Sequence, residues 1–408
     1  MNNVFTFGCR LNFWESDKIN QIIKVNEKSN LTVFNTCSVT NEAVKNIISN
    51  IKKFHIRNPN VKIAVTGCAV ETNLESFEKM KEVSFIIKNS SKLKETSWNK
   101  LSVNKAKKSV YKKDIVNLNR TNPSNSDVRK FIKIQNGCDH SCTFCIIPKC
   151  RGKSISDSVK EINNNIKLVL NNNIKEIILT GVDLTSWGLD LYKNLSLGDL
   201  IKNIFLKNTS YFRLRLSSLD PAELDNSFFQ VLKKDERLMP HFHFSLQSLN
   251  NMILKRMKRR HSVEQVISLF EKIRTISPNA SFGADIIAGF PTESAEMFLE
   301  TKQLIEDLEI SHLHVFPYSE KEGTPASRMP QVPIDERRKR AKELRKLGQN
   351  IYTKVLKKQI LKKQKVLIEN DNRIGKTENN FSIKIKNSSK GDILETIPYK
   401  IENNFLIA

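Results

Sequence analysis

Residues 136–145 read NGCDHSCTFC and place Cys138, Cys142 and Cys145 within one short stretch. A structural zinc ion or a fully ligated iron–sulfur cluster takes four protein ligands. Three closely spaced cysteines therefore indicate either a distant fourth ligand or a metal centre with one open position. Because an open metal position can bind and activate a small molecule, this stretch predicts a reactive centre.

The composition is that of a soluble globular protein. The chain has 408 residues, of which 39% are hydrophobic and 27% charged, enough for about two or three domains. No stretch approaches the roughly 18 apolar residues of a membrane span, and the start, MNNVFTFGCRLN, lacks a secretory-signal pattern. We expect a cytoplasmic protein with no membrane association. In that compartment the seven cysteines are metal ligands, redox groups or buried apolar residues.

The formal net charge of +24 suits a polyanionic partner such as nucleic acid. A compositional bias toward Lys and Asn explains the same excess, so charge alone does not identify the partner.

Three short apolar runs in the N-terminal third each end in a cysteine: VFTFGC at Cys9, LTVFNTC at Cys37 and KIAVTGC at Cys68. Helix-like segments separate the runs, which predicts a parallel, flavodoxin-like α/β sheet. The C-terminal ends of parallel strands meet at one edge, so the three thiols are expected to converge. The residues alone leave open an iron–sulfur cluster, a zinc site or three cysteines that fill gaps in the core.

A second alternating region follows a polar linker at 119–128. Six strand-like runs are separated by helical segments, which predicts a partial parallel barrel of the (β/α)6 type. The runs are 129–135, 175–181, 211–218, 241–248, 281–290 and 312–319. The three-cysteine stretch comes just after the first run, at the end of such barrels where chemistry takes place.

The C-terminal region begins with a long basic helical stretch, 335–365. The runs KVLIE, FSIKIK, DILETIPYKI and FLIA follow, with Asn and Gly turns between them, and predict a small antiparallel β-barrel. Residues 350–408 carry 12 Lys and Arg against 6 Asp and Glu, which favours contact with RNA phosphates. The predicted domains are 1–118, 129–349 and 350–408, with the linker at 119–128.

The pattern Cys-x3-Cys-x2-Cys, with Phe144 before its last cysteine, resembles the signature of the radical S-adenosylmethionine (SAM) superfamily. This resemblance implies that the three cysteines are catalytic and hold a 4Fe–4S cluster whose open iron binds SAM. Cleavage of SAM by one electron then yields a 5′-deoxyadenosyl radical.

The same resemblance extends to two strand-end motifs, LTGVD (179–183) and DIIAGFPTE (285–293), which are similar to the motifs around the methionine and adenine parts of SAM. Arg213 and Arg215 lie on one face of their strand, and an inward-facing arginine can clamp a carboxylate, with polar filling of the barrel interior as the alternative for this pair. His241 and His243 are read as polar filling. The implied cofactor-binding residues are Phe144, Thr180, Gly181, Asp183, Arg215, Gln247 and Asp285.

Over nearly its whole length the chain resembles the methylthiotransferases. The matching stretches are FGCRLNFWES, FNTCSVTNEA, VTGCA, IQNGCDHSCTFCIIPKCRGKS, LTGVDLTSWG, RLRLSSLDP and HVFPYSEKEGTPA. The resemblance implies that Cys9, Cys37 and Cys68 hold a second 4Fe–4S cluster, linked to sulfur insertion, and that a second SAM donates the methyl group. It also implies that the C-terminal region is a TRAM domain, which binds tRNA.

GCRLNFWES together with NTCSVTNEA most resembles the branch that modifies carbon 2 of N6-threonylcarbamoyladenosine beside the tRNA anticodon. The alternatives are the branch acting on isopentenyladenosine, the branch acting on an aspartate of a ribosomal protein, and a non-catalytic iron–sulfur RNA-binding protein. A basic C-terminal region would repel a basic ribosomal protein and therefore favours RNA. The sequence identifies neither the sulfur donor nor the electron donor, and we expect a monomer.

Three features depart from the family pattern. The interval between Cys9 and Cys37 is short, and Leu249 stands where glycine is common, so its side chain is expected to narrow the pocket or shift the loop after Gln247. Cys150, the seventh cysteine, is read as a spectator.

Overall fold

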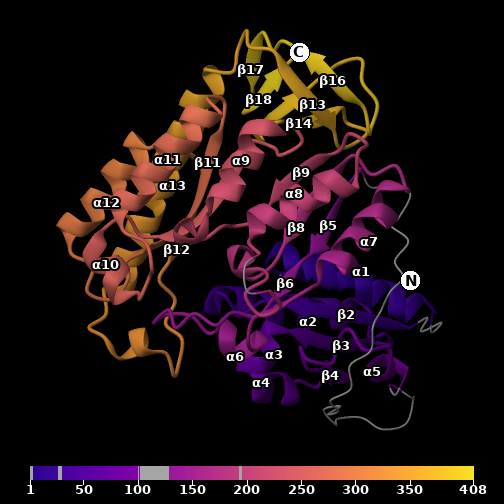
Figure 1. Ribbon diagram of the computed structural model, residues 1–408. Helices are drawn as coiled ribbons and strands as arrows, with labels where there is room; N and C mark the ends of the chain where they lie inside the picture. The colour runs from indigo at the N-terminus through magenta and orange to yellow at the C-terminus, as the bar shows by residue number, and fades with distance from the viewer. Residues whose placement is uncertain (1–2, 26–29, 100, 102–127, 193–194) are drawn as a thin grey trace.

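The computed structural model describes residues 3–25, 30–99, 101, 128–192 and 195–408. Nearly all of the predicted linker lies outside these residues. The described elements form an N-terminal parallel sheet, a central curved array of parallel strands and a C-terminal β-rich region, as Figure 1 shows. Among the described residues, no helix is both long and apolar enough to cross a membrane.

The N-terminal sheet is parallel throughout, in the order β1-β2-β3-β4. Its strands are β1 (Asn3–Thr6), β2 (Leu31–Thr36), β3 (Lys62–Gly67) and β4 (Phe85–Ile87), and its helices are α1 (Arg10–Val25), α2 (Asn41–Arg57), α3 (Cys68–Thr72), α4 (Leu74–Glu78) and α5 (Glu95–Asn99). The prediction of a parallel sheet is confirmed. Its sequential order differs from the flavodoxin order, in which the first strand lies inside the sheet.

Both faces of this sheet are covered because neighbouring side chains of a strand point in opposite directions. Val33 of β2 packs in one core with Ile19 of α1. Phe34, the next residue, packs in a second core with Ile47 of α2. Helices on both faces leave the strand ends as the accessible edge.

The six strands predicted for the central region are all present and parallel. They are β5 (Arg129–Lys133), β8 (Glu176–Thr180), β9 (Arg213–Leu216), β10 (His241–Gln247), β11 (Ser281–Ala288) and β12 (Ile310–Pro317). They form two three-stranded groups, β5-β8-β9 and β10-β11-β12. Two parallel bridges, Leu214 to Leu238 and Leu219 to Phe244, join the groups into one curved array.

Helices pack around this array, and all but the one over residues 251–256, which packs in a separate apolar cluster, share its main apolar core. They are α7 (Val159–Leu170), α8 (Leu197–Lys207), α9 (Asn226–Lys234), α10 (Asn251–Arg256), α11 (Val263–Ile276), α12 (Ala295–Asp307) and α13 (Ile334–Lys357). Capping boxes begin α7 and α8, where Ser158 and Ser196 accept from the amides of Glu161 and Asp199. Such caps satisfy amides that the first turn leaves unpaired.

The C-terminal sheet has the order β16-β13-β14-β15-β18-β17. Its strands are β13 (Gln364–Ile368), β14 (Ile374–Thr377), β15 (Ser382–Lys384), β16 (Ile393–Thr396), β17 (Lys400–Glu402) and β18 (Phe405–Ile407). The β15–β18 pair is parallel and the other pairs are antiparallel. The sequence analysis missed β14, whose four residues, IGKT, carry too short an apolar pattern to be recognised.

Two buried arginines of β9 connect the central strands to the C-terminal sheet. Arg213 donates to the carbonyl of Lys376 at 3.0 Å, and Arg215 donates to the carbonyl of Glu378 at 2.9 Å. The fully buried Glu176 lies between them, 3.0 and 2.9 Å from their Nε atoms. Because buried charges are tolerated only when paired, this cluster fixes how the two regions dock.

Candidate active site

The cysteine-rich loop begins just past β6 (Gln135–Asn136) and ends at α6 (Ile147–Arg151). Cys138, Cys142 and Cys145 are free thiols. Backbone amides two residues downstream donate to the sulfurs of Cys138 and Cys145, each at 3.4 Å. Arg259 Nη1 lies 3.7 Å from the sulfur of Cys142. Donors aimed at all three sulfurs suit thiolates, the form that ligates metal clusters.

Burial works against the thiolate form until a metal is bound. It raises the pKa of Cys138 to about 12 and that of Cys145 to about 11. A bound metal centre reverses this effect because its positive charge stabilises coordinated thiolates, and binding then releases protons. The donor set therefore fits a metal cluster.

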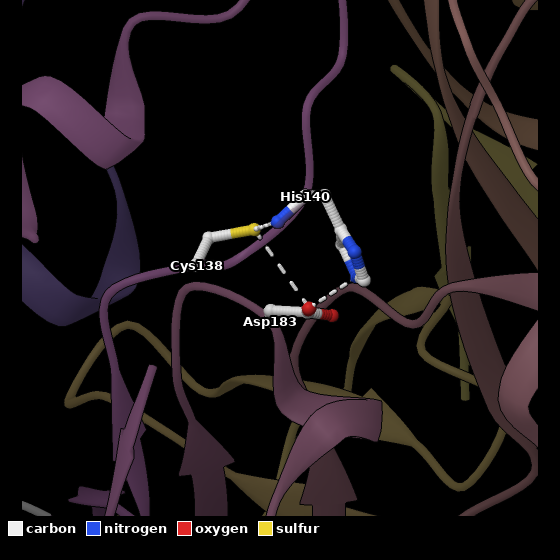
Figure 2. A group of neighbouring side chains, drawn as sticks. All are labelled: Cys138, His140 and Asp183. Atoms are coloured by element: carbon white, nitrogen blue, oxygen red, sulfur yellow. Dashed lines mark hydrogen bonds and ion pairs between the residues drawn. The ribbon is translucent and has the colours of Figure 1, made fainter. Parts of the chain in front are cut away.

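Asp183 lies next to the first cysteine, as Figure 2 shows. Its Oδ2 is 2.6 Å from His140 Nε2 and 3.8 Å from Cys138 Sγ. Burial raises the pKa of Asp183, but hydrogen bonds from His140 and Ser186 outweigh burial and hold the pKa below its ordinary value. The residue is therefore a carboxylate at neutral pH, beside the site where the sequence predicts the amino group of SAM.

Gln135 organises this region, although the sequence analysis did not select it. Its Oε1 accepts from the amides of Val182 and Asp183, at 3.0 and 2.9 Å, and its Nε2 donates to the carbonyl of Gly137 at 2.7 Å. One fully buried amide thus joins the cysteine loop to the end of β8. A Cβ added at Gly181 would lie 2.9 Å from Gln135 Oε1, which explains the glycine there. The one sequence feature that could have indicated this role is the position of Gln135, a polar residue directly before the cysteine motif.

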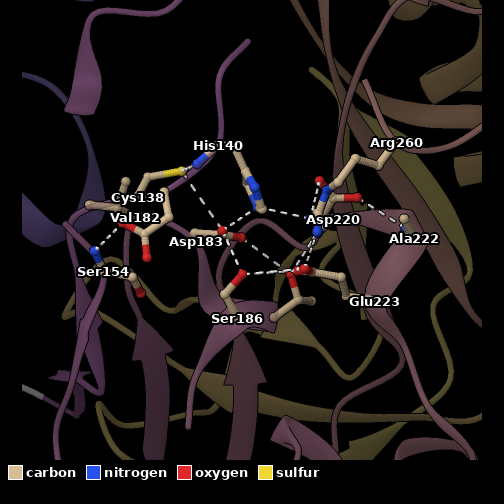
Figure 3. A network of polar contacts seen from close by, with 12 residues as sticks. Cys138, His140, Ser154, Val182, Asp183, Ser186, Asp220, Ala222, Glu223 and Arg260 are labelled. Atoms are coloured by element: carbon tan, nitrogen blue, oxygen red, sulfur yellow. Dashed lines mark hydrogen bonds and ion pairs between the residues drawn. The ribbon is translucent and has the colours of Figure 1, made fainter. Parts of the chain in front are cut away.

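A wider polar network surrounds Asp183, as Figure 3 shows. Ser186 Oγ donates to Asp183 at 2.7 Å and lies 3.2 Å from a carboxylate oxygen of Glu223. Glu223 pairs with Arg260 at 2.5 Å, and Arg260 reaches Asp220 at 3.4 Å.

This network returns to the cysteines through Arg259, whose Nη2 lies 3.0 Å from Asp220. Arg259 also donates to the carbonyl of Ser245 at 2.7 Å. The guanidinium beside Cys142 is therefore held in place by groups from two further strand ends. Nothing in the local sequence pattern around Arg259 marks it as a functional residue.

The other predicted cofactor residues occupy varied positions. Phe144 packs edge-on against Phe290, with ring centroids 6.3 Å apart. Thr180 is buried, and its hydroxyl has no hydrogen-bond partner among the described residues. Gln247 has a positive φ of 68° at a break in the β10–β11 register. Such strain in a non-glycine residue often marks a functional position.

Two predicted cofactor residues have protein partners. Asp285 Oδ1 accepts from His243 Nε2 at 3.0 Å and from His314 Nδ1 at 3.1 Å. The donors of Arg215 go to Glu176 and to carbonyls of the C-terminal sheet. Contact of Arg215 with a cofactor stays a prediction, and it would require these bonds to rearrange.

Leu249 does not narrow the barrel interior. Its side chain is fully buried in the main apolar core, and its amide donates to Thr301 of α12 at 3.4 Å. The side chain thus packs between the strands and the outer helices, away from the cysteine loop.

The N-terminal cysteines converge as predicted, one after each of β1, β2 and β3. Burial, with smaller contributions from the neighbouring Cys68 and Cys9, raises the pKa of Cys37 to about 11. The amide of Val39 donates to the Cys37 sulfur at 3.5 Å. The backbone directly before Cys9 lies close to Cys37, since a Cβ added at Gly8 would lie 2.6 Å from the Cys37 Cβ.

The two cysteine groups are adjacent. Helix α6, which follows Cys145, packs against α3, which begins at Cys68. The sequence predicts that Cys150 of α6 is a spectator, yet a hydrogen bond from its thiol lowers the pKa of Cys68. Ser38 Oγ lies 3.7 Å from the Cys150 sulfur.

A buried ion cluster holds α6 against the N-terminal sheet. Glu15 pairs with Lys92 at 2.5 Å and with Arg151 of α6 at 2.9 Å, all with side chains at most 3% exposed. Arg151 also donates to Asn12 at 2.6 Å. This cluster fixes the separation of the two cysteine groups.

An array of six parallel strands with Cys-x3-Cys-x2-Cys at its mouth defines a class, the radical SAM proteins. Comparison agrees: the radical SAM superfamily profile matches residues 132–305, and the profile described as uncharacterized protein family UPF0004 matches residues 2–88. A radical SAM methyltransferase from Kitasatospora setae, TsrM, has a similar fold, with a TM-score of 0.53 and 12% identity over 78% of this chain and 68% of its own.

Two full-length relatives refine the assignment. The chain is 44% identical to threonylcarbamoyladenosine tRNA methylthiotransferase MtaB of Rickettsia prowazekii, over 99% of this chain and 96% of the relative. It is 32% identical to the enzyme of the same name from Aquifex aeolicus, over 93% and 95%. The chain therefore belongs to the radical SAM tRNA methylthiotransferase family.

Proposed function

We propose that this protein inserts a methylthio group at carbon 2 of N6-threonylcarbamoyladenosine next to the anticodon of tRNA. The observation that carries the proposal is 44% identity, over almost the whole chain, to a relative named for this nucleoside. The convergence of two separate cysteine groups at neighbouring strand ends supports it, because the reaction needs both sulfur insertion and activation of a C–H bond.

The residues present suit two clusters. Cys138, Cys142 and Cys145 would hold one 4Fe–4S cluster and leave a position for SAM, and the N-terminal cysteines would hold a second. When bound, the first cluster and SAM supply hydrogen-atom abstraction from an unactivated carbon.

The protein contributes positioning and charge. Asp183 is a carboxylate that can bind the ammonium of SAM, and Gln135 holds its backbone in place. Arg259 places a positive charge beside the sulfur of Cys142 and offsets part of the thiolate charge. These groups are oriented by the fold before substrate binds, so their alignment costs little when the reaction begins.

The C-terminal sheet is the proposed contact with tRNA. Lys362, Lys384 and Lys386 are exposed there, and the whole chain carries a net charge of +24. Each phosphate contact releases counterions, so binding by this surface should weaken steeply with salt. The charge supports RNA without identifying which tRNA is used.

The function is tested with anaerobically reconstituted protein, SAM, sulfide, a chemical reductant and an anticodon stem-loop carrying N6-threonylcarbamoyladenosine. Nucleoside mass spectrometry should detect the 2-methylthio derivative. Product only on a stem-loop carrying isopentenyladenosine, or 5′-deoxyadenosine without any methylthiolated nucleoside, would overturn the proposal.

A further inference from the structure

Arg10, the residue directly after Cys9, forms no ion pair with an acidic side chain in the described part of the chain. Its Nη1 donates to the carbonyl of Leu216 at 3.3 Å, and this is its only side-chain hydrogen bond among the described residues. Leu216 is the last residue of β9. Arg10 therefore reaches from the N-terminal sheet to the strand end of the central array.

Arg10 reaches solvent from among closely packed neighbours. The residue is exposed to solvent, yet desolvation is the largest effect on its pKa, which is lowered. Both observations hold for a guanidinium that reaches water while protein atoms surround part of it. The charges of Glu176 and Asp285 act on Arg10.

Neither of these carboxylates neutralises Arg10. Glu176 is already paired with two buried arginines, including Arg215 at 2.9 Å. Asp285 accepts from two histidines, including His314. Both acidic groups near Arg10 thus have hydrogen-bonding partners of their own, and the charge of Arg10 remains available to an anionic ligand.

His314 adds a polar group to the same region. Its side chain is 62% exposed, and its Nδ1 lies 3.1 Å from Asp285 Oδ1. The pKa of Asp285 is lowered: burial raises it, but the two histidines outweigh burial. Because an ionised carboxylate only accepts hydrogen bonds, Nδ1 of His314 donates to Asp285.

The position matches the place where substrate must enter. Arg10 is bonded to Cys9 of one cysteine group, and its contact lies at the C-terminal end of β9. The other cysteine group lies at the same end of the central strands, just past β5 and β6. A nucleoside that receives sulfur from one group and reacts at the other has to lie near this residue.

We propose that Arg10 is a specificity residue that binds the free carboxylate of the threonyl group on the target adenosine. This inference rests on the proposed function. The amino nitrogen of threonine is used in the carbamoyl linkage, so its carboxylate stays ionised and free. Arginine suits this ligand because its planar guanidinium can donate two parallel hydrogen bonds to a carboxylate. Adenosine and isopentenyladenosine offer no such charge.

The test removes the proposed ion pair in two ways, by esterifying the carboxylate of the ligand and by replacing Arg10 of the protein. Binding of two fluorescent anticodon stem-loops to the cluster-loaded protein is measured, one carrying N6-threonylcarbamoyladenosine and one carrying its methyl ester. The wild-type protein should bind the ester about 10- to 100-fold more weakly, the range expected for a hydrogen bond to a charged group. Arg10→Gln should bind both stem-loops equally weakly. Without the guanidinium there is no ion pair left for the methyl ester to remove, as in a double-mutant cycle.

Arg57→Gln is the matched control, since Arg57 is exposed on α2 and the substitution removes the same charge; it should keep the wild-type discrimination. Iron content and SAM cleavage without RNA check that Arg10→Gln keeps its clusters. If Arg10→Gln loses its clusters, Arg10→Lys is tested in its place. Arg10→Lys should bind the stem-loop with the free carboxylate about two- to tenfold more tightly than the methyl ester.

Equal binding of acid and ester by the wild-type protein would overturn the inference. So would full discrimination by Arg10→Gln, or none by a cluster-loaded Arg10→Lys. In these cases methylthiolation of N6-threonylcarbamoyladenosine by the wild-type protein would still support the proposed function. Absence of that product would count against the function itself.

Discussion

His140 Nε2 lies 2.6 Å from Asp183 Oδ2, which joins the cysteine loop to the end of β8. The hydrogen bond that His140 donates to Asp183 raises the pKa of His140. The carboxylate is thereby held beside Cys138 in its ionised form. The pair shows how the fold brings the metal-ligating loop and the strand-end motif LTGVD into one site.

Replacing Cys142 with Ala should abolish 5′-deoxyadenosine formation, because two thiolates cannot retain the SAM-binding cluster. The affinity for tRNA should change by less than about twofold, since phosphate contacts dominate it. Chromatographic quantification of 5′-deoxyadenosine and a tRNA binding titration check both. Undiminished cleavage of SAM by this variant would contradict the assignment of the loop.

Gly8→Ala should remove the N-terminal cluster while sparing SAM cleavage. Gly8 has a φ of +102°, and a Cβ there would lie 2.8 Å from the Cys37 sulfur. The iron content should fall from about eight to about four per chain, as expected when one of two 4Fe–4S clusters is lost.

Gly323→Ala is the control, since its φ is +79° but nothing lies within 4 Å of an added Cβ. This variant carries the same kind of backbone strain without the clash and should keep about eight irons. Full iron content in Gly8→Ala would show that the N-terminal site differs from the one described.

Arg215→Met should loosen the C-terminal sheet, because it removes donors to the carbonyls of Thr377 and Glu378. Limited proteolysis should release a C-terminal fragment about tenfold faster, with tRNA affinity reduced and SAM cleavage retained. Breaking a buried charge cluster typically costs about 3–5 kcal/mol, which is enough for this effect. The exposed Arg373→Met serves as control. Loss of SAM cleavage with unchanged proteolysis would instead support the predicted cofactor contact of Arg215.

Glu15→Gln should destabilise the protein at neutral pH more than in acid. Burial raises the pKa of Glu15, but Lys92 and Arg151 outweigh it and hold the pKa at about 2. A depressed pKa stabilises the fold above the ordinary value of 4.5, and that contribution is lost as pH falls toward about 2.

Urea denaturation of the two proteins should therefore differ by about 3–5 kcal/mol at pH 7 and by much less near pH 3. Glu78→Gln, an exposed residue of α4, should show no such difference. A gap between wild type and Glu15→Gln that stays constant across this range would disprove the linkage.

Periodic and local features could be predicted from the sequence. The apolar runs that end at Cys9, Cys37 and Cys68 became β1, β2 and β3 because each is short, β-branched or aromatic and bounded by helical segments. Their convergence followed from parallel pairing alone. The six strands of the central array were found for the same reason.

Long-range polar partners could not be predicted. Arg259 contacts Cys142 across 117 positions of the chain, and Arg213 reaches Lys376 across 163. Nothing near either arginine marks its partner, because the contact exists only after the strands are assembled. Leu249 shows the same limit, since its position in the core depends on the packing of α12.

Transfer of the hydrogen from carbon 2 tests the central claim most directly. A stem-loop whose N6-threonylcarbamoyladenosine carries deuterium at carbon 2 is incubated with the loaded protein, SAM and reductant, and 5′-deoxyadenosine is analysed by mass spectrometry. We predict deuterium in the 5′-deoxyadenosine together with the methylthiolated nucleoside. Methylthiolated product accompanied only by unlabelled 5′-deoxyadenosine would contradict the account.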